Sequence, residues 1–382
     1  MVDAAFIEEI LARMVQIDST NPSLSPSGAG EAEIADYVAQ LLTDLGLEVT
    51  RHEPEAGRVS VVGRLAGSGN GRSLMLNAHM DTVAVDGMAE PFSGAIRDGK
   101  LYGRGSQDMK GSLAAQIAAV AALKQQGMVL AGDLFVAAVA DEEHASIGVQ
   151  SILPHYQPDG AIVTEPSDLQ ISLAHKGFAW LTVRTVGRAF HGSRPDMGID
   201  ANMQMGRFLA KLYALSQELA ERPAHPLLGH ASLHAATIQG GTVWSSYSAD
   251  CVCGVERRTL PGETAAQVFA EINAILDELR AADPTFKATL EIELVRDPFE
   301  VAADALLVQE LTQATTAVLG TPAPYIGQTF WTDAAFHATA GSETVLIGPV
   351  GDGLHSDEEW VDVQSVVQLA EILAKTAVAY CQ

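Results

Sequence analysis

The chain has 382 residues, of which 47% are hydrophobic and 19% are charged, and its formal net charge at pH 7 is −25. This length is typical of two domains of about 100–200 residues each, and the composition is typical of a soluble globular protein. A surface this negative repels phosphate backbones and anionic lipid, which excludes nucleic acids and membrane surfaces as expected partners.

The cysteines and the N-terminal segment bear on the cellular compartment. Three cysteines are too few for a disulfide framework, so we expect reduced thiols. The N-terminal segment MVDAAFIEEILARMV has acidic residues and helical periodicity, which does not fit a signal peptide. No apolar run reaches the roughly 18 residues that a membrane span needs. We therefore expect a cytoplasmic protein.

Along the first half of the chain, strand patterns and helix patterns alternate. Apolar spacings of three and four predict helices over 4–17, 30–46, 110–126 and, shorter, 148–155. Short apolar runs predict strands over 59–65, 73–78, 133–140 and 161–164. This alternation predicts an α/β domain whose central, mostly parallel sheet is covered by helices.

The pattern changes near residue 177. Strict alternation predicts a half-exposed strand over 178–186. Further helices are predicted over 200–221 and 263–281, with strands over 233–239, 249–256 and 287–296. After Pro298 the first pattern returns, with a helix, strands over 323–327 and 343–348, and a helix over 362–380. We therefore predict a catalytic metal-binding domain (1–176 and 297–382) and an inserted α+β lid and dimerisation domain (177–296).

The strand over 73–78 is followed by His79, one residue, and Asp81. Ends of strands in α/β sheets are where ligand sites form. A histidine that binds a metal needs its second ring nitrogen held by an oxygen, and Asp81 is close enough in sequence to supply one. By itself, this H-x-D pattern is weak and often has no metal.

Carboxylates recur at similar places further along the chain. Asp108 lies in the glycine-rich segment YGRGSQDMKG, just before a predicted helix, where an N-cap is the competing interpretation. Glu142 and Glu143 follow a buried strand in ADEE, Glu165 follows another in VTEP, and His355 lies in GLHSDEE. Three consecutive acids after an apolar strand are costly to hold together without a cation, although such a run is often a solvated loop.

Taken together, two histidines and three carboxylates suit two zinc-like ions that share one bridging carboxylate. The predicted metal ligands are His79, Asp108, Glu143, Glu165 and His355. A neighbouring carboxylate, Glu142, stays available as a general base.

The chain resembles the M20 metallopeptidase family, in its acetylornithine deacetylase and succinyl-diaminopimelate desuccinylase branch. The matching stretches are AHMDTV (78–83), YGRGSQDMKG (102–111), DEE (141–143), TEPSDLQISLAHKG (164–177), FHGSRPDMGIDA (190–201), GG (240–241), RTLPGE (258–263), TDAAF (332–336), GP (348–349) and HSDEEW (355–360). They occur in the family's order and span most of the chain.

This resemblance implies a role for each matching residue. His79 and Glu165 would hold one ion, Glu143 and His355 the other, and Asp108 would bridge both. Asp81 would orient His79. Glu142 would take a proton from the attacking water and pass it to the leaving amine.

Three further residues are assigned by resemblance to the inserted domain. His191 is similar to a lid-domain histidine that crosses a dimer interface and stabilises the oxyanion, so a homodimer is expected. Arg258 resembles an arginine that binds a substrate carboxylate, a task suited to a guanidinium. Ser245 stands where many relatives place an asparagine near the substrate. Glu256 stands where an aspartate is frequent.

The sequence thus predicts a dinuclear hydrolase that binds two divalent ions, zinc first, with cobalt and manganese as alternatives. The expected substrate is an N-acyl amino acid or a short peptide. Three functions stay open: an N-acyl amino acid deacylase of the deacetylase or desuccinylase type, a dipeptidase or carboxypeptidase of the same family, and a catalytically silent binding module.

Overall fold

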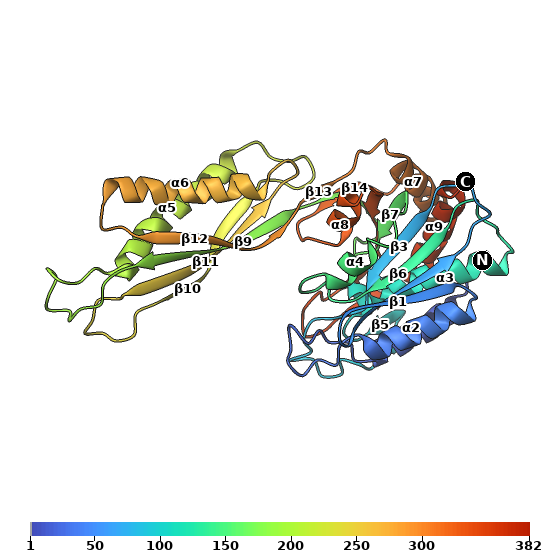
Figure 1. Ribbon diagram of the computed structural model, residues 1–382. Coiled ribbons are helices and arrows are strands. Elements are labelled where there is room, and N and C mark those ends of the chain that lie inside the picture. The colour runs from blue at the N-terminus through green and yellow to red at the C-terminus, as the bar shows by residue number, and fades with distance from the viewer. Residues whose placement is uncertain (1) are drawn as a thin grey trace. The chain divides into compact units, whose positions relative to one another are not determined.

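The computed structural model describes residues 2–382, which form two compact units (Figure 1). Unit 1 contains the chain up to residue 173 together with 301–326 and 332–382, and unit 2 contains 174–300 and 327–331. The roles that the sequence assigns to them, catalysis for one and lid and dimerisation for the other, stay predictions.

The large sheet, most of which lies in unit 1, has nine strands, in the order β1-β2-β6-β3-β7-β15-β8-β13, with β14 beside β8. These strands are β1 (Glu48–Glu55), β2 (Arg58–Leu65), β3 (Leu74–His79), β6 (Leu134–Val139), β7 (Gly160–Val163), β8 (Ile171–His175), β13 (Phe299–Glu300), β14 (Tyr325–Gln328) and β15 (Glu343–Leu346).

The four central strands β6, β3, β7 and β15 are parallel, whereas β1, β2, β8 and β13 pair antiparallel. The sheet is therefore mixed, and its parallel part is the centre. The α/β fold class is confirmed. Since parallel strands end at the same edge, the segments after β3, β6 and β7 emerge close together.

Helices cover the large sheet on both faces. They are α1 (Ala4–Gln16), α2 (Ala32–Asp44), α3 (Gly111–Gln125), α4 (Ile147–Ile152), α7 (Leu306–Leu319), α8 (Ala334–Thr339) and α9 (Val363–Tyr380). Val62 of β2 belongs to a buried cluster with Val149 and Ile152 of α4. The next residue, Gly63, faces the opposite side, where a Cβ would come within 2.9 Å of Leu42 in α2. This glycine lets α2 approach the sheet closely.

Helix α3 is buried on nearly every side, because it lies against the sheet, α1 and α9. Its Ala-rich sequence, apolar all round, fits that position. Before it comes a distorted π-helical turn, η1 (Ser106–Lys110), in which Asp108 and Met109 depart from helical dihedral angles. Asp108 therefore lies in this turn, just before α3.

A small second sheet lies next to η1. Its strands are β4 (Ala95–Arg97), β5 (Lys100–Tyr102), β16 (Gly351–Asp352) and β17 (Trp360–Asp362).

Unit 2 is a four-stranded antiparallel sheet with two helices. Its elements are β9 (Gly177–Val186), α5 (Ala201–Glu221), β10 (Ser232–Gly240), β11 (Asp250–Thr259), α6 (Ala265–Ala282) and β12 (Ala288–Arg296). Alternate residues of β9, such as Leu181 and Val183, pack with Phe208 and Ile272 from the helices. The other face of β9 carries exposed side chains, as the strict alternation predicted.

Two smaller expectations can be compared with the structure. All three cysteines are free and buried. Within residues 2–382, none of the helices is both long enough and apolar enough to span a bilayer.

His337 in α8 is a buried titratable group that is not among the predicted site residues. It is fully inaccessible, and neither ring nitrogen has a hydrogen-bond partner among the described residues. Burial lowers the pKa of His337 from 6.5 to about 4. At a pH between about 4 and 6.5, His337 therefore takes up a proton in the unfolded chain but not in the folded one.

We predict that this histidine makes the fold acid-sensitive. The free energy of unfolding falls by about 1.4 kcal/mol per pH unit as pH drops below 6.5, because only the unfolded state takes up the proton. Urea unfolding at pH 8 and pH 5 should show a loss about 2 kcal/mol larger for wild type than for His337→Leu. Because the two proteins share every other titratable group, the difference between their losses reports the titration of His337. Equal losses in both proteins would contradict the prediction.

Candidate metal centre

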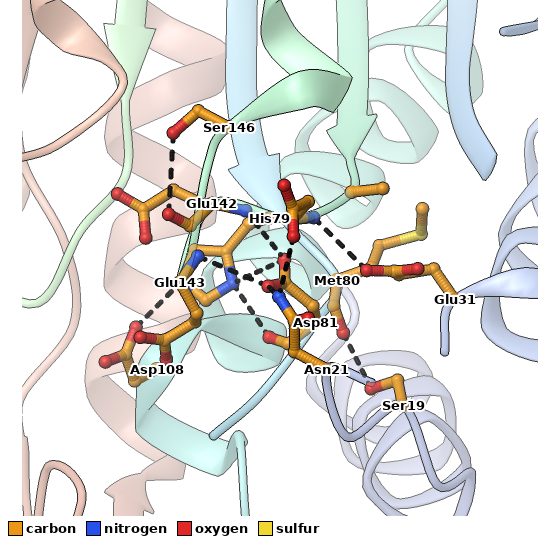
Figure 2. A network of polar contacts seen from close by, with 12 residues as sticks. Ser19, Asn21, Glu31, His79, Met80, Asp81, Asp108, Glu142, Glu143 and Ser146 are labelled. Carbon is orange, nitrogen blue, oxygen red and sulfur yellow. Dashed lines mark hydrogen bonds and ion pairs between the residues drawn. The ribbon is translucent and has the colours of Figure 1, made fainter. Parts of the chain in front are cut away.

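Acidic and histidine side chains gather at the carboxyl ends of the parallel strands. His79 ends β3, Glu142 and Glu143 follow β6, and Glu165 follows β7. Asp108 comes from the turn η1. Figure 2 shows His79, Asp108, Glu142 and Glu143 converging from these separate segments.

Two groups of ligand atoms share His79. Donor atoms of His79, Asp108 and Glu143 all lie within 4.8 Å of one another, and so do those of His79, Glu142 and Glu165. His79 Nε2 is 2.9 Å from Asp108 Oδ1. The fifth predicted ligand, His355, joins the first group, because its Nε2 lies 3.2 Å from Glu143 and 3.5 Å from Asp108 Oδ2.

All five predicted ligands are thus brought together in unit 1, and Glu142 lies with them. The second group includes Glu142 as a ligand candidate, beside its predicted role as the base. The metal content of a Glu142→Ala variant distinguishes a metal ligand from a general base.

The charges of this cluster are strongly coupled. Burial raises the pKa of Glu142 and Glu165 well above the ordinary value, and nearby carboxylates, including Asp333, raise it further. Burial also acts to raise the pKa of Asp108, but hydrogen bonds from His355 and His79 hold that pKa below its ordinary value. In return, Asp108 and Glu143 raise the pKa of His355 to about 10.

The donor set fits divalent cations. No described residue donates a hydrogen bond to the side-chain carboxylate of Glu142, which is half-buried, or of Glu165, which is buried. Such carboxylates repel one another unless protons or cations intervene. Carboxylate oxygens and imidazole nitrogens at this spacing suit zinc-like ions.

Asp81 makes two kinds of contact at the site, one through its backbone carbonyl and one through its carboxylate. His79 Nδ1 donates to the backbone carbonyl of Asp81 at 2.8 Å, whereas the Asp81 carboxylate is 3.6 Å away. The backbone carbonyl therefore selects the His79 tautomer that directs Nε2 toward the acids. The Asp81 carboxylate instead accepts from the backbone N–H groups of Glu142 and Glu143, at 3.1 and 3.2 Å.

A buried polar network, not anticipated from the sequence, supports the 141–143 turn. Asn21 Nδ2 donates to both Asp81 and Asp141, and Arg58 binds Asp141 and Glu31, each at 2.7 Å (Figure 2 includes Asn21, Asp81 and Glu31). Asp141 has a positive φ of 65°, so the turn depends on these contacts. Asn21 lies in a loop rich in Ser, Pro and Gly, and Arg58 opens a strand, so no local pattern marks either residue.

The three residues assigned to the inserted domain lie in unit 2. His191 and Ser245 are on two exposed loops joined by a backbone bond from Gly192 to Ser245. His191 Nδ1 accepts from the backbone N–H of Ser193 at 3.2 Å, which leaves Nε2 as a donor in the neutral ring. The tautomer suits stabilisation of an oxyanion.

Arg258 is at the other end of the same sheet, near the end of β11. Its guanidinium lies over the ring of Phe178, 5.2 Å from the centroid, and its Nε donates to Glu256. Glu256 also accepts from the indole N–H of Trp180. The glutamate noted in the sequence thus fixes the orientation of Arg258, and about a third of the Arg258 side chain stays accessible.

Comparisons with known proteins agree with this fold. The family profile described as peptidase family M20/M25/M40 matches residues 75–379. Acetylornithine deacetylase from Myxococcus xanthus is 29% identical, over 97% of this chain and 96% of its own length. Acetylornithine deacetylase from Vibrio campbellii is 28% identical, over 99% of both chains.

Solved structures show the same fold at lower identity. Aminopeptidase PepT from Bacillus cereus superposes with a TM-score of 0.82 at 19% identity, covering all of both chains. A dinuclear metal-binding peptidase of family M20 from Bacillus subtilis superposes with a TM-score of 0.76 at 15% identity, covering 98% of both chains.

The fold and the clustered ligands define a metal-dependent hydrolase that acts on C–N bonds. The chain belongs to peptidase family M20/M25/M40, which the sequence motifs indicated. This family is metal-dependent, and the two ligand groups are a candidate dinuclear site.

Removing the buried cation of the supporting network is predicted to destabilise unit 1. Arg58→Met leaves Glu31 and Asp141 without their partner, which costs about 3–5 kcal/mol of unfolding free energy. Arg64 in the same strand is a matched control, because its ion pairs with Glu48 and Asp133 are much more exposed. Arg64→Met should cost about 1 kcal/mol or less in urea unfolding. Similar losses for both variants would contradict this account.

Proposed function

We propose that this protein hydrolyses the amide bond of an N-acyl amino acid, as a deacylase of the deacetylase or desuccinylase type. The observation that carries the proposal is the convergence of five ligand side chains, His79 and Asp108 among them, with a fourth carboxylate, Glu142, beside them. The similarity to deacetylases over nearly the whole chain supports this reaction class.

The proposed centre binds two divalent ions, with zinc as the native metal and cobalt or manganese as alternatives. His79 and Glu165 would hold one ion, Glu143 and His355 the other, and Asp108 both. When bound, such ions polarise the scissile carbonyl and lower the pKa of water from about 15.7 toward 7.

Glu142 is the proposed proton carrier. Its carboxylate has no fixed protein donor among the described residues, and burial raises its pKa, so it is suited to accept a proton near neutral pH. It takes the proton of the attacking water and delivers it to the leaving amine. Asp81 keeps Glu142 in place through the backbone of the 141–143 turn.

Unit 2 supplies the groups that recognise the substrate in this proposal. Arg258, oriented by Glu256, binds the substrate carboxylate, and His191 donates to the developing oxyanion through Nε2. Ser245 lies on the loop joined to that of His191 and is the third proposed contact. The cytoplasmic location expected from the sequence stays a prediction.

We also propose a homodimer formed through unit 2. Strand β10 is an edge strand whose side chains are almost all exposed, and such edges are covered in native assemblies. Large apolar side chains on this unit are unusually accessible: Met203 (70%), Tyr213 (67%), Ile238 (55%) and Trp244 (fully exposed). Burying such side chains against a second copy would stabilise a dimer.

Light scattering after gel filtration tests the homodimer. The wild type should have the mass of two chains, and Ile238→Lys in β10 should shift it toward one, because a charge on an edge strand blocks pairing. Thr289→Lys, in the exposed part of the opposite edge strand β12, is the matched control and should stay dimeric. A monomeric wild type would contradict the proposal.

A substrate panel tests the reaction. Chelator-treated protein is reloaded with zinc or cobalt and assayed on N-acetyl and N-succinyl amino acids, and on free dipeptides at the same concentrations. The proposal expects turnover of an acylated amino acid at a higher kcat/KM than any dipeptide. Faster cleavage of dipeptides would indicate a peptidase, and no turnover on either set would contradict the proposed reaction.

Glu142→Ala separates the base from the ligands. Loss of a general base costs at least about 10²–10⁴-fold in kcat, so turnover should be abolished while metal content stays near two ions per chain. Glu143→Ala should instead lose metal, as determined by elemental analysis of the dialysed protein. If Glu142→Ala is the variant that loses metal, the roles of these two glutamates are exchanged.

A further inference from the structure

Glu359 is a carboxylate that the proposed reaction does not use, yet it is 1% exposed and saturated with donors. Its Oε1 accepts from the backbone N–H groups of Gln107 and Asp108, at 2.9 and 3.1 Å. Its Oε2 accepts from the N–H of Gly105 at 3.0 Å and from Arg104 Nη1 at 2.8 Å. All four donors belong to one segment of five residues.

That segment needs an external acceptor. It precedes α3 as the turn η1, and the N–H groups at the beginning of a helical turn have no carbonyl partner within it. Gly103 and Gly105 have positive φ values of 140° and 78°, so the chain here is shaped by its contacts and not by a regular element. Glu359 accepts three backbone N–H groups that would otherwise be buried without a partner.

The same contacts join two segments of the metal centre. Arg104 donates to the backbone carbonyl of Ser356 at 2.8 Å as well as to Glu359. Ser356 directly follows His355, whereas Asp108 belongs to the segment that Glu359 holds. A single ion pair, Arg104–Glu359, therefore fixes the loop of His355 against the turn of Asp108.

We propose that Glu359 is a positioning residue of the metal centre, which sets the place of the bridging carboxylate of Asp108 relative to His355. The proposal rests on the proposed function, because it takes Asp108 and His355 as metal ligands. Glu359 does not touch an ion itself, since its oxygens are occupied by donors. Loss of partners outside the ligand shell typically costs 10–100-fold in metal affinity.

The experiment titrates the chelator-treated, full-length protein with cobalt(II) and follows the visible absorption of the bound ion and the heat of binding. In Glu359→Gln, the amide NH₂ replaces an acceptor facing Arg104 and Gly105. We expect the dissociation constant of at least one ion to be about 10–100-fold larger, and the cobalt spectrum to change. The neighbouring exposed Glu358→Gln is the matched control and should reproduce wild type in both.

These readouts distinguish positioning from a merely structural role, which would change thermal unfolding but leave the spectrum and affinity of the folded protein unaltered. Unfolding in chelator, followed by circular dichroism, checks that Glu359→Gln is folded. If it is not, R104Q/E359Q, which removes the buried ion pair as a unit, replaces it in the same titration.

A folded variant with wild-type affinity and spectrum overturns the positioning role of Glu359 while leaving the proposed function intact. A wild type that binds fewer than two cobalt ions contradicts the proposed dinuclear site, whatever the variant does. The two failures are therefore distinguishable in one titration.

Discussion

The structure of unit 1 depends on holding many carboxylates close together at one edge of a sheet. Buried acids that face one another repel strongly, and the chain deals with them in two ways. Asp81, Asp141 and Glu359 are saturated by donors, from Asn21, Arg58, Arg104 and backbone N–H groups. Glu142 and Glu165 receive no such donors from the described residues, and burial, together with the charges of neighbouring carboxylates, raises their pKa values. The acids without donors are those to which the proposed reaction assigns a role, and the saturated acids hold the turns that present them.

Much of the architecture could be predicted because its central elements are locally distinctive. The strands β3, β6 and β7 are short apolar runs buried on both faces, and each is followed by a histidine or acid, which also revealed the ligands. The edge strand β1, with the sequence EVTRHEPE, has no such pattern, since it pairs on one side only and is largely exposed. The strands β4, β16 and β17 have two or three residues each, too few for any periodicity.

The supporting shell of the site could not be predicted in the same way, because its contacts are made across the chain. Asn21 reaches Asp141 over 120 positions, and Glu359 reaches Gly105 over 254. No local spacing encodes such a pair. Asp81 shows the same point more subtly: its place beside His79 was visible in the sequence, but its backbone carbonyl orients the ring and its carboxylate holds the glutamate turn. Sequence proximity identified the residue, and the structure adds that its carbonyl, and not its carboxylate, is the oxygen closest to the ring nitrogen.

The division of charge between the two units fits the proposed substrate. An N-acyl amino acid carries a carboxylate, and the protein has a net charge of −25. The electrostatic field of the whole protein therefore opposes binding of this substrate. The acids of unit 1 would repel that carboxylate unless cations cover them. Unit 2, by contrast, offers Arg258 against the aromatic ring of Phe178. Burial lowers the pKa of nearby Lys176, and the positive charge of Arg258 lowers it further. In the proposed reaction, recognition of the substrate carboxylate is therefore assigned to Arg258, in the unit that lacks the acidic cluster.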